Sequence, residues 1–468
     1  MSVGAPGDAP VTAQGAGTGV ALPSVRSRLV SGSRWSFGAV AAMLVSGLAG
    51  NVLLSRLLAP AELGTYYLTL SAVTTLCVVG RLGLDLAAVR LVARCVATGS
   101  QADVRAVVLR TCLLAAGSAA VLGLLLAGGP GRLLAESVFD SPALAAYLPL
   151  VGLWAAAEAL RQVLSECFRG FHDIRRAMVF GAPAQTVLAS LLFALLLLSP
   201  DRRDARSTTA LACTASLVLL VLAALSLGRR LARLPGGGRT AARTVLAFSL
   251  PVMLQTLLSK GLNQADLWVV GASQSAQDVA LYGAAARAAN LIQTPMFVLG
   301  LVLAPIVAEQ VALGQYRRLE ALLRGASTLL AVPMLVFLLV AAVFGDTVLS
   351  VLFGGYYARG QDVLLLLAVG LFAGAVVLNQ GTLIMAGHQG LSLLLAAVLT
   401  GLTLIAEVLL VGPYGTTGVA AASGAGSVLT AVVFAVAIRR RLGIWVVASL
   451  SPRQVRELLA ALRSPRGG

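Results

Sequence analysis

Charge is scarce in this chain. Asp, Glu, Lys and Arg make up 12% of its 468 residues, whereas 58% of the residues are hydrophobic. A soluble domain carries about 25% charged residues, so the sequence lacks the polar surface that a water-soluble body of this size needs. The apolar residues also gather in blocks of about twenty, the length that spans a bilayer core of about 30 Å. The composition therefore predicts an integral membrane protein.

Acidic residues are rarer than basic ones: 19 Asp and Glu stand against 35 Lys and Arg, and the formal net charge is +16. In a soluble protein such an excess would point to nucleic acid. Here the arginines lie at the edges of the apolar blocks, which is the positive-inside pattern of membrane proteins. We therefore expect membrane lipids, and no nucleic acid, among the partners.

Lysine, histidine and paired cysteines are nearly missing. Lys260 is the only lysine, and the two histidines, His172 and His388, lie far apart in the sequence. No two of the five cysteines have the CxxC spacing that is typical of metal and redox sites. We predict reduced, structural thiols, no disulfide and no metal site.

Motifs of common enzyme classes are also absent. The sequence contains no GxxxxGK[ST] phosphate loop, no HExxH zinc motif and no GxSxG nucleophile turn. The longest loop expected on the outer side covers about 127–143, which is too short for a catalytic domain. The sequence favours a protein that is not an enzyme and needs no cofactor.

Twelve apolar blocks are expected to form transmembrane helices, which makes the fold class an all-α integral membrane protein. The seventh block is the least regular, because Lys260, Asn263, Gln264 and Asp266 interrupt it. The blocks lie at 36–58, 63–79, 107–126, 144–164, 178–198, 208–227, 245–270, 279–303, 326–344, 363–385, 391–411 and 418–438.

Arginine counts on the two sides of these blocks predict the orientation. One side holds 26 Arg and Lys residues and the other holds 7, with Arg110 and Arg287 left inside blocks. The richer side is cytoplasmic by the positive-inside rule, so both termini are expected in the cytoplasm.

Three short matches repeat at an offset near 215 residues. They pair Tyr66 with Tyr282, Phe139 with Phe353, and Gly170 with Gly387. The repeat predicts two parallel six-helix halves around a central cavity. We assign 1–33 to a disordered cytoplasmic tail, 34–228 to the first half, 229–243 to a cytoplasmic linker, 244–441 to the second half, and 442–468 to a cytoplasmic tail with a short surface helix at 451–462.

Ionisable residues inside the blocks are the candidate site residues, because charge is costly in a bilayer and tends to line cavities. Arg110 lies near the start of the third block, where it either reaches the interface or faces a cavity. Glu158 and Arg161 are spaced i, i+3 on the fourth block. They form either an ion pair within one helix or a charged cavity wall.

The second half carries the remaining candidates. Asp266 and Arg287 lie on neighbouring blocks, where they either neutralise each other or serve a ligand, with Arg287 facing an anion. Asn290 and Gln293 follow on the same block as Arg287. Glu407 lies in the middle of the eleventh block without a basic residue nearby, and it is either a coupling-ion site or a structural acid. Asp266 is the second candidate for the coupling-ion site.

Five segments carry a family resemblance. They read LSRLLAPAELGTY at 54–66, LGLDLAAVRLVAR at 82–94, FRG at 168–170, ALYGAAAR at 280–287 and LSVLFGGYY at 349–357. In these segments the chain resembles the polysaccharide-biosynthesis flippases of the multidrug/oligosaccharidyl-lipid/polysaccharide (MOP) exporter superfamily, from about residue 34 to 441.

The resemblance implies flipping of an undecaprenyl-pyrophosphate-linked oligosaccharide from the cytoplasmic to the outer face of the bacterial plasma membrane, by alternating access. Cavity arginines are then expected to bind the pyrophosphate, since the guanidinium fork suits phosphate, and H⁺ or Na⁺ is a possible coupling ion. A cation-coupled multidrug antiporter of the same superfamily would instead have an acidic, aromatic cavity. A membrane-embedded glycosyl transferase or polymerase is a third hypothesis, and an envelope scaffold that transports nothing is a fourth.

Overall fold

The structure is a computed structural model that describes residues 25–127, 148–236, 238, 242–257, 264–377 and 380–448. Within this part of the chain the secondary structure is helical, apart from one isolated antiparallel bridge between Val377 and Val447. The predicted all-α fold class is therefore confirmed. The surface helix predicted at 451–462 lies outside the described residues.

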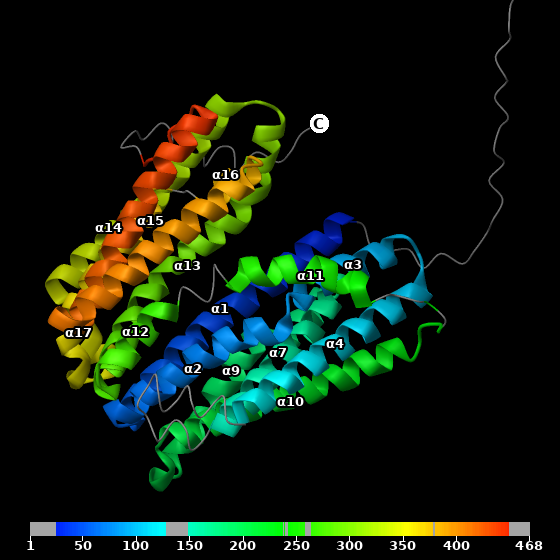
Figure 1. Ribbon diagram of the computed structural model, residues 1–468, viewed down its shortest axis with the longest axis horizontal. Helices are drawn as coiled ribbons and strands as arrows, with labels where there is room; N and C mark the ends of the chain where they lie inside the picture. Colours follow the sequence, from blue (N-terminus) through cyan, green and yellow to red (C-terminus); the bar gives the residue numbers. More distant parts are fainter. Residues whose placement is uncertain are drawn as a thin grey trace, which may run out of the picture.

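The helices fall into two groups in space (Figure 1). The first group contains α1 (Val25–Leu57), α2 (Pro60–Arg81), α3 (Leu84–Ala97), α4 (Gln101–Ala127), α7 (Leu148–Gly170), α8 (Ile174–Phe180), α9 (Ala182–Phe193), α10 (Ala205–Leu231) and α11 (Ala242–Thr256). The second group contains α12 (Ala265–Ser273), α13 (Ala276–Ala312), α14 (Tyr316–Phe353), α15 (Gln361–Val376), α16 (Gln380–Met385) and α17 (Gln389–Leu442).

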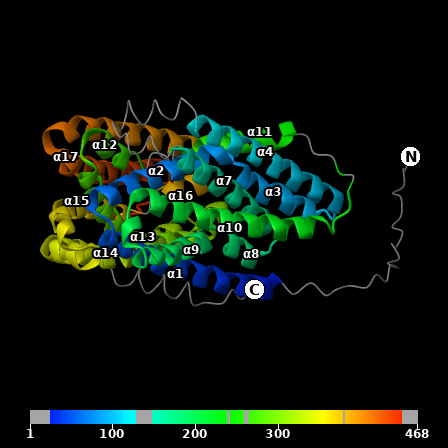
Figure 2. The ribbon, with the colours of Figure 1, turned by 90° about the horizontal axis from the view of Figure 1, so that it is seen from below.

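The two groups meet at one end and diverge toward the other, as the views in Figure 1 and Figure 2 show. The main contact joins α2 to α13, and smaller contacts join α1 to α14 and α2 to α12. At this joined end Gly64 of α2 lies so close to Ala276 of α13 that a Cβ on Gly64 would stand 1.7 Å from the Ala276 carbonyl oxygen. A glycine is required there because only a bare backbone permits that approach.

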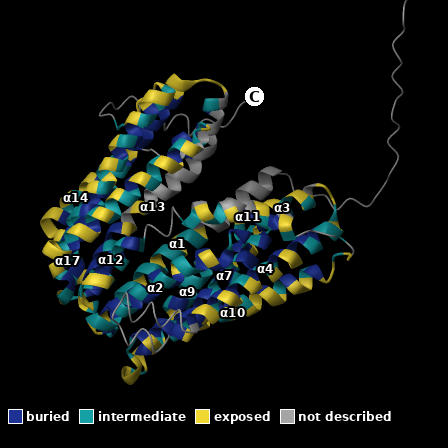
Figure 3. Ribbon diagram, viewed as in Figure 1, coloured by how far each residue is buried: buried dark blue, intermediate teal, exposed yellow. Residues whose placement is uncertain are grey.

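Exposed residues are spread along the helices (Figure 3), and many of them are large and apolar. Leu124, Leu198 and Leu409 are 73%, 80% and 68% exposed, whereas the buried core contains many alanines. Small residues inside and large aliphatic residues outside are the pattern of helices that pack in lipid. Within the described residues, eight helices are long and apolar enough to cross a membrane.

The predicted blocks map onto these helices with three interruptions. The block at 178–198 breaks at Gly181, between α8 and α9; the block at 245–270 divides into α11 and α12; and the block at 363–385 breaks at Val377. The last two blocks share α17, whose backbone is non-helical at Gly415 (φ 58°, ψ −140°), shortly after Pro413. The predicted count of twelve helices stays a prediction.

Some boundaries also differ from the expected ones. The helix α1 begins at Val25, inside the stretch expected to be a disordered tail. The helix α11, expected in the second half, packs on α3, α2 and α4 of the first group. Gly83 permits this, because it has a left-handed backbone (φ 70°) and a Cβ there would lie 2.2 Å from the Ser249 carbonyl oxygen.

Candidate functional site

A cavity of about 610 Å³ lies within the second group. Its described lining comes from α12, α13, α15 and α17 together with Gln264, and it contains Asp266, Asn290, Gln293 and Glu407. Four of the predicted site residues therefore line one space. Hydroxyl groups complete the polar lining: Thr400, Thr403, Ser423, Ser427 and Thr430.

Asp266 is held at the start of α12. Its Oδ1 accepts the Leu267 N–H at 2.8 Å, and its Oδ2 accepts the Tyr282 hydroxyl at 2.9 Å. Tyr282 is fully buried on α13, so the carboxylate is fixed to two helices. This explains why Asp266 needs no arginine partner inside the bundle: both of its oxygens already accept hydrogen bonds.

Glu407 lies deeper and is less satisfied. The residue is 3% exposed, and its Oε1 accepts the Ser423 hydroxyl at 2.6 Å. Its Oε2 is buried, and the described part of the chain offers it no hydrogen-bond partner. A buried carboxylate oxygen without a partner is costly, so this atom is a natural acceptor for a proton or a metal cation.

Each of the two carboxyl groups accepts a hydrogen bond from a hydroxyl group. Tyr282 donates to Asp266, and Ser423, which also lines the cavity, donates to Glu407. The two acids therefore line one cavity, and each has a hydroxyl partner from another part of the second group.

Arg287 points away from this cavity and toward the first group. Its Nη1 donates to the Gly283 carbonyl at 3.1 Å, and its guanidinium carbon lies 3.5 Å from the centre of the Tyr67 ring. The Tyr67 hydroxyl in turn donates to Asn51 Oδ1 at 3.3 Å. Among the described residues no ion pair joins Arg287 to Asp266, and a role of Arg287 in binding an anion stays a prediction.

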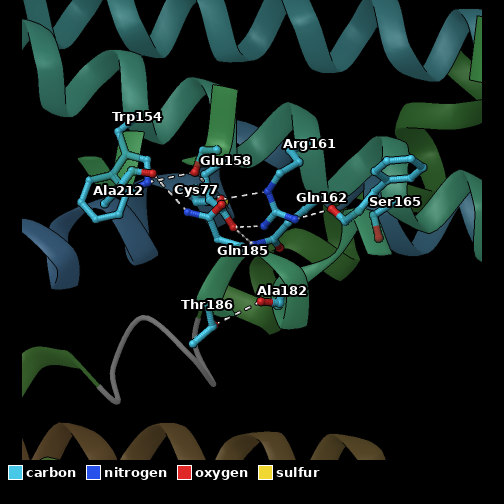
Figure 4. Close-up of polar contacts among 12 residues, drawn as sticks. Cys77, Trp154, Glu158, Arg161, Gln162, Ser165, Ala182, Gln185, Thr186 and Ala212 are labelled. Carbon is cyan, nitrogen blue, oxygen red and sulfur yellow. Dashed lines mark hydrogen bonds and ion pairs between the residues drawn. The ribbon is translucent and has the colours of Figure 1, made fainter. Parts of the chain in front are cut away.

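A second polar cluster lies inside the first group (Figure 4). Arg161 has no exposed surface, and both Nε and Nη2 donate to the Glu158 carboxylate, with Nε at 3.1 Å. Of the two alternatives for these residues, the structure contains the ion pair within one helix. Since the guanidinium is enclosed, Arg161 does not line an open cavity in this arrangement, and its predicted role in substrate binding stays a prediction.

The cluster extends to residues that the sequence did not single out. Gln162 donates to Glu158 at 2.6 Å and accepts from Arg81 at 2.7 Å, and Arg81 pairs with Asp85 at 2.8 Å. Two arginines and two acids therefore cancel within the first group. The i, i+4 spacing of Arg81 and Asp85 could have revealed that pair, whereas the contact with Gln162 depends on the fold.

Arg161 also donates a hydrogen bond to a backbone carbonyl at the break between α8 and α9. Its Nη1 donates to the Phe180 carbonyl, the last of α8. Gly181 is extended and Pro183 is the second residue of α9, so the helical hydrogen-bond ladder is interrupted here. An arginine that covers a freed carbonyl has a structural task as well as an electrostatic one.

Arg110 is exposed on α4, next to Leu109 and near Leu113, which are 44% and 66% exposed. This position is far from the second-group cavity, whose described lining does not include it. The described residues contain no group of three His, Cys, Asp or Glu side chains placed to hold a metal ion.

Comparisons with known proteins agree with this architecture. The sequence pattern of a family described as "Polysaccharide biosynthesis protein" matches residues 33–311, more than half of the chain. No curated protein matches the chain.

Among solved structures, an inward-facing multidrug-resistance MATE-family transporter of the MOP superfamily is 18% identical, with a TM-score of 0.65 over 86% of this chain and 94% of that chain. An outward-facing conformation of such a transporter is 18% identical with a TM-score of 0.57, over 89% and 96% of the two chains. A MOP superfamily transporter from Pyrococcus furiosus, described by its reversed binding-pocket polarity, is 17% identical with a TM-score of 0.57, over 89% and 96%. These likenesses establish a MATE-like fold.

Proposed function

We propose, from the premise that this chain belongs to the polysaccharide biosynthesis protein family and is a multi-pass membrane transporter of the MOP superfamily, that it flips a lipid-linked oligosaccharide. The cargo would be an undecaprenyl-pyrophosphate-linked oligosaccharide, carried from the cytoplasmic to the outer face of the bacterial plasma membrane. The observation that carries the proposal is the family match over 33–311, which includes Arg287 and all of α13 except its last residue.

The orientation supports loading from the cytoplasm. The helix ends where the two groups diverge carry arginine-rich segments, such as the ends of α10 and α17 (Figure 1). By the positive-inside rule these ends are cytoplasmic, so the space between the groups would open to the cytoplasm. The higher TM-score with the inward-facing transporter, 0.65 against 0.57, agrees with this direction.

Arg287 is the proposed pyrophosphate ligand. It stands on α13 where the second group meets α2, and its side chain is only partly buried. Its present partners, a tyrosine ring and one carbonyl, leave most of its five N–H donors available. A guanidinium in that state can bind phosphate in a bidentate manner when the cargo enters.

Asp266 and Glu407 are the proposed coupling-ion site. The buried Glu407 Oε2, which has no hydrogen-bond partner among the described residues, suits a proton, and a sodium ion would use the same carboxylate oxygens. Binding the cation within the second group would change the charge of that group alone. If the cation binds one arrangement of the two groups more tightly than the other, its gradient can drive alternating access.

The acidic lining favours a second candidate function, cation-coupled multidrug export. The described lining of the cavity includes two acids and no basic residue, as expected for a pocket that accepts organic cations. The same described lining contains no aromatic side chain, which an antiporter cavity of this type is expected to have.

Purified protein in proteoliposomes separates the two functions. The probe is undecaprenyl pyrophosphate carrying one radiolabelled hexosamine, and flipping is measured by protection from a membrane-impermeant pyrophosphatase. Ethidium efflux under a proton gradient is measured in parallel. Flipping that Arg287→Ala abolishes would support the flippase, whereas ethidium efflux without flipping would replace it by the antiporter. Sugar transfer by the purified protein would favour a glycosyl transferase instead.

A further inference from the structure

After α17 ends at Leu442, the next residues stay packed against the second helix group. Gly443 has a left-handed backbone (φ 73°) that stops the helix, and its carbonyl accepts the Arg439 side chain. Residues 443–448 then return along the second group; we call them the C-terminal strap. The predicted C-terminal tail, 442–468, thus begins with a segment that packs against the second group, and its cytoplasmic location stays a prediction.

The strap is packed like core. Ile444 and Val446 are 3% and 0% exposed, and they belong to the buried cluster that contains Val377 and Phe434. The Ser327 hydroxyl of α14 donates to the Val446 carbonyl at 3.0 Å. Trp445 alternates outward and is 42% exposed, as expected for an extended segment with one buried face.

The strap lies where the predicted tenth helix is broken. Val377 leaves the helical region (φ −126°, ψ 102°), so α15 ends at Val376. The last carbonyls of a helix lose their partners at such a break, which is costly inside a membrane protein. Ala448 N–H donates to the Val376 carbonyl at 2.9 Å, and Val447 bridges Val377. The strap thus supplies the hydrogen bond that the broken helix lacks.

The same helix forms a wall of the cavity. Gly370, Leu371 and Gly374 of α15 line it, and Gly374 stands two residues before the strapped carbonyl of Val376. The strap also continues α17, whose Ser427 and Thr430 line the cavity on another side. One short segment therefore fixes the ends of two cavity walls to each other and to α14.

We propose that the C-terminal strap is a clasp that keeps the broken end of α15 in place and thereby holds the second-group cavity open. Releasing it would let the end of α15 move and the wall close over the cavity. The inference goes beyond the proposed function, because it concerns the shape of the cavity and holds for any cargo.

Thiol labelling tests the clasp without knowledge of the substrate. In a variant whose five cysteines are replaced by alanine, Asn290→Cys puts a thiol on the cavity lining, where the native side chain is exposed. Ala448→Pro then removes the N–H that donates to the Val376 carbonyl. The matched control is Trp445→Ala, which changes an exposed strap residue.

We expect Ala448→Pro to slow labelling by a membrane-impermeant maleimide about fivefold, the effect of losing one backbone hydrogen bond, and Trp445→Ala to leave the rate unchanged. Both proteins should elute as single species in size exclusion. Equal labelling rates for Ala448→Pro and its parent would overturn the clasp. A chain ending at Ala448 should label like the full chain, and one ending at Leu442 should label like Ala448→Pro; if the shorter chain does not fold, the proline variant decides alone.

Discussion

The joined end of the two helix groups gives the sharpest prediction, at Gly64. A Cβ at this position would lie 1.7 Å from the Ala276 carbonyl oxygen, 2.7 Å from its carbon and 3.1 Å from the Ala280 nitrogen. All three atoms belong to the backbone of one rigid helix, so no side chain can turn away to make room. Since carbon atoms pack at about 3.5–4.0 Å, Gly64→Ala must move α2 and α13 apart by more than 1 Å, on the order of half a methyl diameter.

Overpacking of this kind costs about 1–3 kcal/mol. The cost falls only on the arrangement in which this end is joined, so the equilibrium should move toward the opposite arrangement about 5–150-fold. Gly117→Ala on α4 is the matched control, because a Cβ there meets nothing within 4 Å.

Spin labels at two exposed positions on the diverging ends report the result: Gln101→Cys at the start of α4 and Arg440→Cys near the end of α17, in the cysteine-free variant. Double electron–electron resonance should show a larger population of short distances between the two spin labels in Gly64→Ala. The distance distribution should not change in Gly117→Ala. A distance distribution in Gly64→Ala that matches its parent would refute the view that this contact closes one end of the transporter.

Three further predictions concern the charged residues. Arg287→Ala should abolish flipping, and Arg287→Lys should keep part of it because the charge survives without the bidentate guanidinium. Asp266→Asn should not restore flipping to Arg287→Ala; if it does, the two residues only neutralise each other. Glu407→Gln should leave binding of the labelled lipid intact and remove the dependence of transport on a proton or sodium gradient, and an unchanged dependence would exclude Glu407 as the coupling acid. Arg161→Leu should destabilise the protein by about 3–5 kcal/mol, because Glu158 stays buried without its partner. Thermal melting should show this loss, and combining Arg161→Leu with Glu158→Gln should recover part of the stability.

The sequence predicted the helices better than their interruptions. Hydropathy counts apolar residues over a window, so it found the blocks that contain α8 with α9 and α15 with α16 as if each were continuous. The breaks depend on where freed carbonyls find donors: Arg161 for Phe180, and Ala448 for Val376. Those donors come from segments distant in sequence, and no local pattern reveals them.

For the site, spacing along one helix was sufficient only to offer the ion pair as one of two alternatives. Glu158 and Arg161 pair as their i, i+3 spacing indicates. Asp266 and Arg287 lie on neighbouring helices, yet each has a different partner, since Tyr282 occupies the acid and the Tyr67 ring faces the guanidinium. Which face of its helix each residue uses is a property of packing, and the sequence indicates only that the two helices are adjacent.

The cancelled charges of the first group have an electrical consequence. With Arg81, Arg161, Glu158 and Asp85 neutral as a set, the membrane field exerts little net force on the interior of that group. Any voltage sensitivity should then arise in the second group, where one elementary charge moved across the full field changes the energy by about 2.3 kcal/mol per 100 mV. Transport currents recorded under voltage clamp should therefore lose their steepness in Glu407→Gln and keep it in variants of the first-group cluster that still fold.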